Sequence, residues 1–184
     1  MGVDWNGYEL ERSGVPRPLA PAPSAKDARA AFEKLMASKP ERLRQLADLL
    51  AANGVALATS DEAIQALNDW YRHNVAADQA HPRALAEEWW SVTRDISLFL
   101  GDTMIARNPG LAWRYYSRPP VVGIGYRRHV IMGFADPNYY EYPELMVSGY
   151  GHSLLGTLRV RDPTRFRGVV NVSERVRRSP HASD

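Results

Sequence analysis

The pattern that most limits how this chain can fold is a seam of apolar residues between Leu85 and Ala106. Successive members are separated alternately by four and three positions, and they include Trp89, Ile96 and Phe99. This spacing places them along one face of an α-helix. Because an Asn-Pro-Gly sequence follows at once and ends the pattern, we expect one continuous helix over 82–107. That helix should be the element around which the rest of the chain packs.

Shorter helical patterns precede this seam. Ser24 has the character of an N-cap and begins a helix that should run to about Ala37. Pro40 suits the first turn of a second helix, which should end at Asn53 before a glycine. Ser60, followed by two acidic residues, marks the start of a third. Residues 1–23 are rich in proline and should form an extended arm.

After Gly110 the period of the apolar residues changes from helical to alternating. Strands are expected at 111–116, 121–126 and 130–134, followed by helices that begin near Pro143 and Asp162. The expected fold is therefore α+β. Helices at the N-terminus and a long central helix accompany a small, mainly antiparallel sheet, which C-terminal helices cover. We expect one domain over 24–178 and a frayed tail over 179–184.

Composition excludes several kinds of site. Among the 184 residues there is no cysteine, so disulfides, thiolate nucleophiles and cysteine zinc sites are ruled out. No window approaches the ~18 uninterrupted apolar residues of a membrane span, and the first residues lack the pattern of a secretory signal. These observations predict a cytoplasmic protein that has no membrane partner. No motif for a cofactor is present, so none is expected.

Four stretches of the sequence follow one another in a familiar order. They read DEAIQALNDWYRHNV (61–75), WWSVTRDISLFLGDTMIARNPGLAWRYY (89–116), HVIMGF (129–134) and YPELMVSGYGHSLLG (142–156). This order resembles a group of uncharacterised bacterial proteins with domains of unknown function. Related families look like immunity or interaction proteins. The resemblance implies an α+β fold and a protein partner, and it brings no catalytic residues.

Three acidic residues recur at intervals of seven along the expected long helix. Glu88, Asp95 and Asp102 should share one face, where carboxylates could serve acid–base chemistry or a divalent cation. The alternative is a solvated flank or a set of partners for arginines. Asp95 should lie at the edge of the buried seam and be paired with an arginine of the sheet, Arg114 or Arg127.

Histidines offer little support for a metal site. No two of the five are spaced four apart, and no HExxH sequence occurs, so no metal is expected. His152 lies in a glycine-rich stretch, where it either packs against its neighbours or lines a pocket.

Aromatic and arginine side chains are concentrated after residue 112. All twelve basic side chains of residues 101–184 are arginines, against seven acidic ones. Tyrosine, tryptophan and arginine are enriched at the centres of protein interfaces, although the same mixture stacks single-stranded bases or fills the core of a sheet. The candidate binding residues are Trp113, Arg114, Tyr116, Tyr126, Arg127, Arg128, His129, Tyr139 and Tyr140.

No catalytic motif accompanies these residues. The GxSxG and P-loop patterns are both missing. The sequence therefore favours a non-enzymatic bacterial protein that binds another protein, immunity-like or regulatory, through its aromatic and arginine-rich surface. Two alternatives remain open. One is binding of nucleic acid by the arginine-rich C-terminal half, and the other is an enzyme that uses the face of Glu88, Asp95 and Asp102.

Overall fold

The fold is α+β, with five helices and a two-stranded antiparallel sheet in the part of the chain that the structure describes. The structure is a computed structural model, and it describes residues 2–5, 7–117, 124–156 and 162–171. In chain order the elements are α1 (Ala25–Ala52), α2 (Asp61–Asn74), α3 (Glu87–Arg107), β1 (Ala112–Tyr115), β2 (His129–Met132), α4 (Pro143–Leu154) and α5 (Arg165–Val170).

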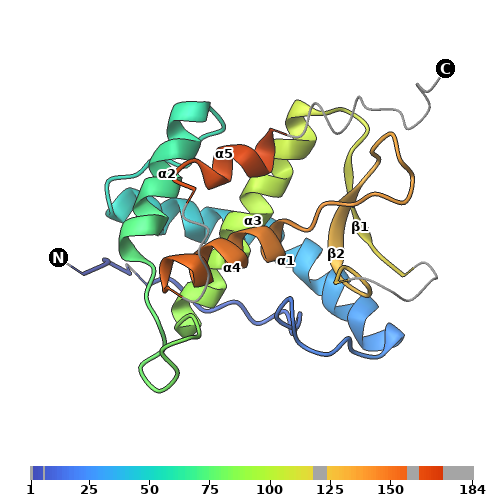
Figure 1. Cartoon of the computed structure of the whole chain (residues 1–184), viewed down its shortest axis with the longest axis horizontal. Coiled ribbons are helices and arrows are strands. Elements are labelled where there is room, and N and C mark those ends of the chain that lie inside the picture. The colour runs from blue at the N-terminus through green and yellow to red at the C-terminus, as the bar shows by residue number, and fades with distance from the viewer. Residues whose placement is uncertain (1, 6, 118–123, 157–161, 172–184) are drawn as a thin grey trace.

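Helix α3 is the central element, and α1, α4 and α5 all pack against it (Figure 1). Every residue from 91 to 101 is buried, on all sides of the helix. The apolar seam supplies one face, since Trp89, Val92 and Ile96 belong to the main core. The helix begins at Glu87 rather than at 82. Residues 77 and 85 instead form an isolated bridge that closes the preceding loop, which contains bends and a turn.

Helix α1 is one continuous helix of 28 residues, which corrects the expectation of two helices that meet at Pro40. Its N-cap is Ser24, whose hydroxyl accepts a hydrogen bond from the Asp27 backbone as predicted. Proline in a helix interior removes one backbone hydrogen bond and usually breaks the helix. Here the helix is anchored by buried residues both before Pro40, at Leu35, and after it, at Leu46. Packing on both sides therefore outweighs the local preference.

The sheet is a hairpin whose register pairs Trp113 with Ile131 and Tyr115 with His129. Both strands lie close to the expected positions. The expected strand over 121–126 is not found at residues 124–126, which form a turn, and its remainder lies outside the described residues. Glycine 125 is packed too tightly against the Tyr140 ring to allow a side chain.

Residues 7–23 contain no helix or strand, yet they pack along the body of the protein. In Figure 1 this segment, which we call the arm, passes below α4 and α3 before it enters α1. Ser13, Val15 and Pro18 are buried in it. The arm is therefore part of the folded structure. None of the described helices has the length and apolar character needed to span a membrane.

Candidate functional site

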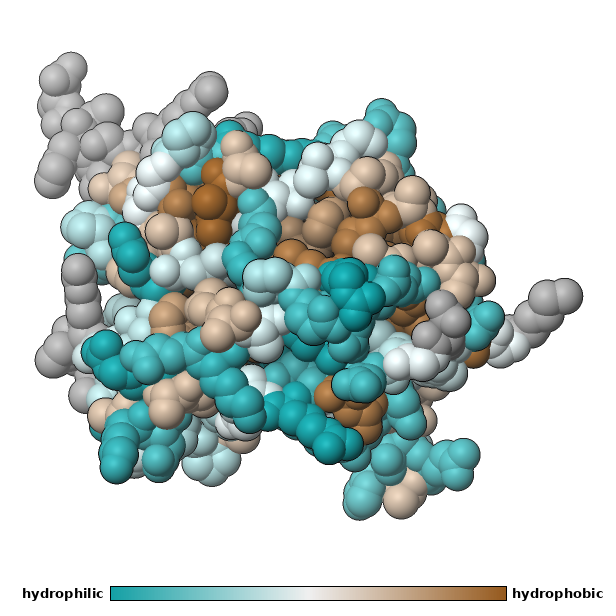
Figure 2. All heavy atoms as spheres, turned by 180° about the vertical axis from the view of Figure 1, so that it is seen from behind, coloured by the Kyte–Doolittle hydropathy of each residue, from teal (hydrophilic) through white to brown (hydrophobic). Residues whose placement is uncertain are grey.

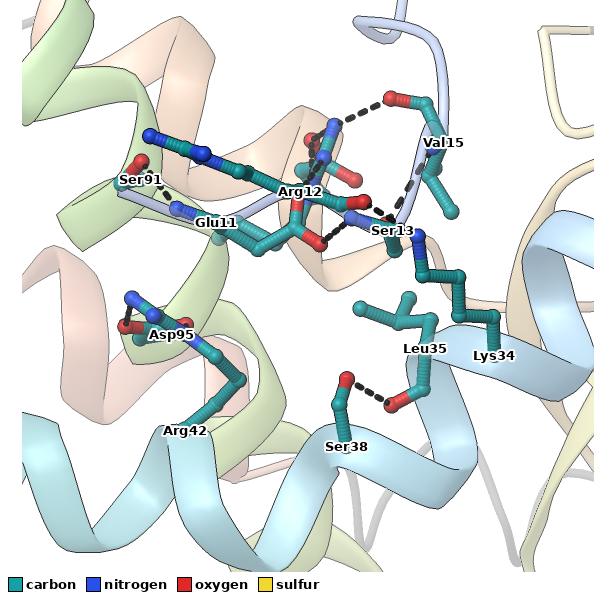
Figure 3. A network of polar contacts seen from close by, with 12 residues as sticks. Glu11, Arg12, Ser13, Val15, Lys34, Leu35, Ser38, Arg42, Ser91 and Asp95 are labelled. Carbon is teal, nitrogen blue, oxygen red and sulfur yellow. Dashed lines mark hydrogen bonds and ion pairs between the residues drawn. The ribbon is translucent and has the colours of Figure 1, made fainter. Parts of the chain in front are cut away.

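Two buried ion-pair clusters fix the arm to α3, and they begin at consecutive residues of that helix. Asp95 has no solvent exposure, and Arg42 of α1 holds it through two hydrogen bonds, from Nε at 3.0 Å and from Nη2 at 2.6 Å. The Tyr8 hydroxyl of the arm donates to the same carboxylate. Figure 3 shows Arg42 reaching from α1 to Asp95 on α3. The prediction that Arg114 or Arg127 pairs with Asp95 is wrong, because α1 rather than the sheet faces Asp95.

Arg94 is the centre of the second cluster. Its guanidinium pairs with Glu11 of the arm and, at 2.9 Å, with Glu144 of α4, and it donates to the Val15 carbonyl. His129 Nε2 lies 2.9 Å from the other Glu144 oxygen. Arg94 therefore joins the arm to α4. Burial opposes ionisation of Glu144, but the charges of Arg94 and His129 lower its pKa to about 2.

The three carboxylates expected to share a face lie in three different surroundings. Glu88 is exposed in a cleft of about 760 Å³ that also contains His73 and Asp78. Asp95 is enclosed as described, and Asp102 accepts hydrogen bonds from Lys39 at 2.6 Å and from the Trp113 indole at 2.7 Å. The structure does not bring them together. Within the described residues, no group of three or more acidic or histidine side chains could hold a metal ion.

Most of the candidate aromatic and arginine residues contact other parts of the fold. Trp113 is half-buried against Gly101 of α3, and His129 is buried in the second cluster. The Tyr116 and Tyr140 rings pack 4.8 Å apart. The other rings also have neighbours, since Tyr139 packs edge-on against Phe134 and Tyr126 lies beneath Arg127. Arg114 is exposed. These residues therefore form one side of the core and its rim more than a free binding surface.

A groove lies between the arm and α4 and has a mainly apolar lining. It measures about 450 Å³ and is lined by Arg17, Pro18, Leu19, Ala20, Trp90, Leu145, Ser148, Gly149 and His152. The indole nitrogen of Trp90 is buried and has no hydrogen-bond acceptor. Arg17 lies 4.7 Å above the Trp90 ring, and the His152 ring lies 5.5 Å from it. His152 thus lines a pocket, and its Nδ1 contacts the Ser148 carbonyl at 2.8 Å.

The groove is bordered by an exposed leucine. Leu19 is 79% exposed and Ile124 51%, and both are large apolar side chains. Elsewhere, as on the face shown in Figure 2, apolar residues occur in separate areas bordered by hydrophilic ones. Exposed apolar groups next to a hollow are typical of interaction sites.

No protein-family model, curated protein or solved structure matches this chain. The resemblance to immunity-like proteins therefore stays a prediction, and the site is interpreted from its own geometry.

Sequence reasoning missed the residues that matter most here. Arg94 and Glu144 have the usual appearance of surface charges in a helix, and Trp90 is next to the seam rather than in it. Leu19 is in a segment expected to be an extended arm. The sequence contains one sign that Arg94 and Asp95 are buried. Arg94 and Asp95 are surrounded by short and apolar side chains on both sides of the sequence, which is unusual for a helix with a solvent face.

Proposed function

We propose that this protein is a non-enzymatic binding protein, and that its apolar groove takes a bulky apolar side chain from an extended segment of another protein. The observation that carries the proposal is the groove of about 450 Å³ with Trp90 and Leu145 in its lining. Its volume suits an aromatic or large aliphatic side chain together with its backbone. Aromatic residues in such pockets commonly supply much of the binding energy at protein interfaces.

Two features favour a protein segment over a small molecule. Leu19 stands exposed at the edge of the groove, where a small ligand would leave it uncovered and a longer segment would bury it. The buried Trp90 indole lacks an acceptor, and a backbone carbonyl of an extended segment could supply one. The candidate function is thus the protein binding expected from the sequence, at a different surface.

Nucleic-acid binding has less support. Binding of a phosphate backbone needs a row of accessible cations. Arg114 is exposed, but Arg128 is only 3% exposed and lies under the arm. No cleft joins Glu88, Asp95 and Asp102, so an enzyme based on those residues has no common site in the described part of the chain.

A matched pair of glycine substitutions tests the groove. Gly149 lines it, and a Cβ atom added there would meet no atom within 4 Å. Gly149→Leu should therefore fill the groove. Gly168 on α5 is an equally open helical glycine that does not line it, so Gly168→Leu is the control. Leucine favours helix over glycine by up to about 1 kcal/mol, so neither change should unfold the protein.

The measurement is selection of random peptides displayed on phage, followed by affinities for the purified variants. We expect the wild-type protein to enrich peptides with a bulky apolar residue. Gly149→Leu should weaken their binding at least about tenfold, and Gly168→Leu should not. Equal binding by the two variants, or no enrichment by the wild-type protein, would reject the groove as the binding site.

A further inference from the structure

A second hollow adjoins the groove at Leu19. It measures about 370 Å³ and is lined by Pro18, Leu19, Ala20, Ala22, Ile124, Tyr126 and Arg128. Pro18, Leu19 and Ala20 line both hollows, so an extended segment that leaves the groove across Leu19 enters the second hollow. The charged residues that line the two hollows are arginines, Arg17 and Arg128, and neither hollow is lined by a carboxylate.

Arg128 is a buried cation without a counter-charge. It is 3% exposed, and its Nη2 donates to the Ala20 carbonyl at 2.6 Å. Its Nε and Nη1 are buried and make no hydrogen bond of normal geometry, and the neighbouring Tyr142 hydroxyl, also buried without a partner, is neutral. In the described part of the chain, no carboxylate is within ion-pair distance of Arg128, and Glu144, the buried acid of α4, is already held by Arg94 and His129. A buried charge of this kind is unfavourable unless something pairs with it.

Arg127, the preceding residue, repeats the arrangement. Its Nη1 donates to the Pro23 carbonyl at 2.7 Å, and its Nε is buried without an acceptor. Among the described residues other than glycine, it alone has a positive φ, of 56°. Such a backbone costs free energy in a residue with a side chain, and strain of this kind concentrates at functional sites. The turn thus holds two successive guanidinium groups against neutral carbonyls of the arm.

We propose that this second hollow binds a carboxylate of the partner segment, an aspartate or glutamate next to the apolar residue in the groove, with Arg128 as its receptor. The inference rests on the proposed function. A carboxylate forms stronger, charge-assisted hydrogen bonds to a guanidinium than a neutral carbonyl does. It would displace the Ala20 carbonyl from Nη2 and accept two hydrogen bonds, one from Nη2 and one from the neighbouring Nε or Nη1. Residues 18–22 belong to no helix or strand, so their displacement breaks no regular hydrogen bonding.

The rim of the hollow favours an acidic peptide over a phosphate chain. Leu19 and Ile124, both exposed and apolar, flank Arg128. In a complex with a peptide, these two side chains would contact methylene groups and neighbouring side chains. In a complex with a nucleic acid, they would instead face the charged phosphate backbone. The partner segment should therefore combine a bulky apolar residue with an acidic one.

Two capped dipeptides test this chemistry on the wild-type protein. The probes are acetyl-Phe-Glu-amide and acetyl-Phe-Gln-amide, titrated into the ¹⁵N-labelled protein. The indole N–H signal of Trp90 reports the groove, and the Nε–H signal of Arg128 reports the second hollow. We expect both peptides to shift the Trp90 signal, and the Glu peptide to bind about tenfold more tightly and to shift the Arg128 signal.

Variants separate this inference from the proposed function. Arg128→Met should abolish the preference for the Glu peptide, whereas Arg114→Met, at an exposed arginine outside both hollows, should preserve it. Equal affinities of the two peptides for the wild-type protein would overturn the carboxylate site and leave the groove standing. Absence of any shift at Trp90 with both would overturn the groove and the inference with it. An Arg128 response to inorganic phosphate as strong as that to the Glu peptide would also contradict the inference, because it would show unspecific anion binding.

Discussion

Asp95 and Glu144 show how two buried carboxylates respond to different partners. Neither has any solvent exposure. Burial raises the pKa of Asp95 to about 6, although Arg42 and Tyr8 act to lower it. Around Glu144 the balance is reversed, because Arg94 and His129 outweigh the effect of burial and lower the pKa to about 2. The pKa values of two buried carboxylates are thus shifted in opposite directions, in two clusters that both contact the arm.

Replacement of Asp95 tests the first cluster. Asp95→Ala removes the carboxylate that pairs with Arg42, which is itself 6% exposed. Loss of one partner of a buried ion pair costs about 3–5 kcal/mol, so we expect the free energy of unfolding to fall by more than about 2 kcal/mol in urea melts. The control is Asp48→Ala, which removes an exposed partner of Arg44 and should have little effect. An unchanged midpoint for Asp95→Ala would contradict the structural role.

The seam predicted that Asp95 lies near the core, and that an arginine would face it. It could not identify the arginine. The choice between Arg42 and the arginines of the sheet depends on which element packs against that side of α3, and no local pattern in the sequence encodes this. The same holds for Arg94, whose partners are 83 residues before it and 50 residues after it.

At the level of elements, the helix boundaries set by local chemistry were predictable. Ser60 caps α2 and Asn108 ends α3 as expected, because capping and turn residues act over a few positions. Pro40 misled the prediction for α1, since its local signal is outweighed by packing at a distance. Residues 124–126, which form a turn, were mistaken for the end of a strand because Val122, Ile124 and Tyr126 alternate with glycines.

Gly101 controls how α3 meets the hairpin. A side chain at this position would collide with the Trp113 ring. Gly101→Ala should therefore lower stability by about 1–3 kcal/mol through overpacking. Gly149→Ala, in open space on α4, should instead raise it by about 0.5–1 kcal/mol. Thermal melts of the two variants measure the difference, and a stabilised Gly101→Ala would show that Trp113 does not pack there.

At the level of the whole molecule, the arm was the least predictable part. Its prolines correctly indicate a lack of helix and strand, but they do not indicate where it lies. The groove and the second hollow both depend on that placement, because Pro18, Leu19 and Ala20 line each of them. A site made by an irregular segment and a distant helix leaves no spacing pattern in the sequence.

The pH dependence of stability should reflect both clusters. The folded pKa of Glu144 is below its ordinary value of 4.5, so its contribution is present above pH 4.5 and is lost as the pH falls toward 2. The folded pKa of Asp95 is above 3.8, so its contribution is present below pH 4 and is lost as the pH rises through 6. Each change is on the order of 3 kcal/mol.

Urea melts across this pH range measure the two contributions. Glu144→Gln should reduce the loss of stability between pH 4.5 and 2, and Asp95→Asn should reduce the decline between pH 4 and 6. If either variant keeps the slope of the wild-type protein in its range, the corresponding carboxylate does not titrate as its surroundings indicate.

The arm has a further consequence during synthesis. Tyr8 contacts Asp95, which is 87 positions later in the chain, and Glu11 contacts Arg94, which is 83 positions later. Ribosomes add roughly 5–20 residues per second, so the arm leaves the ribosome on the order of ten seconds before α3 exists to receive it. Until then Glu11 and Tyr8 lack their partners on α3. The first part of the chain to be made is therefore among the last to be fixed in place, and a nascent chain stalled before residue 94 cannot close either cluster.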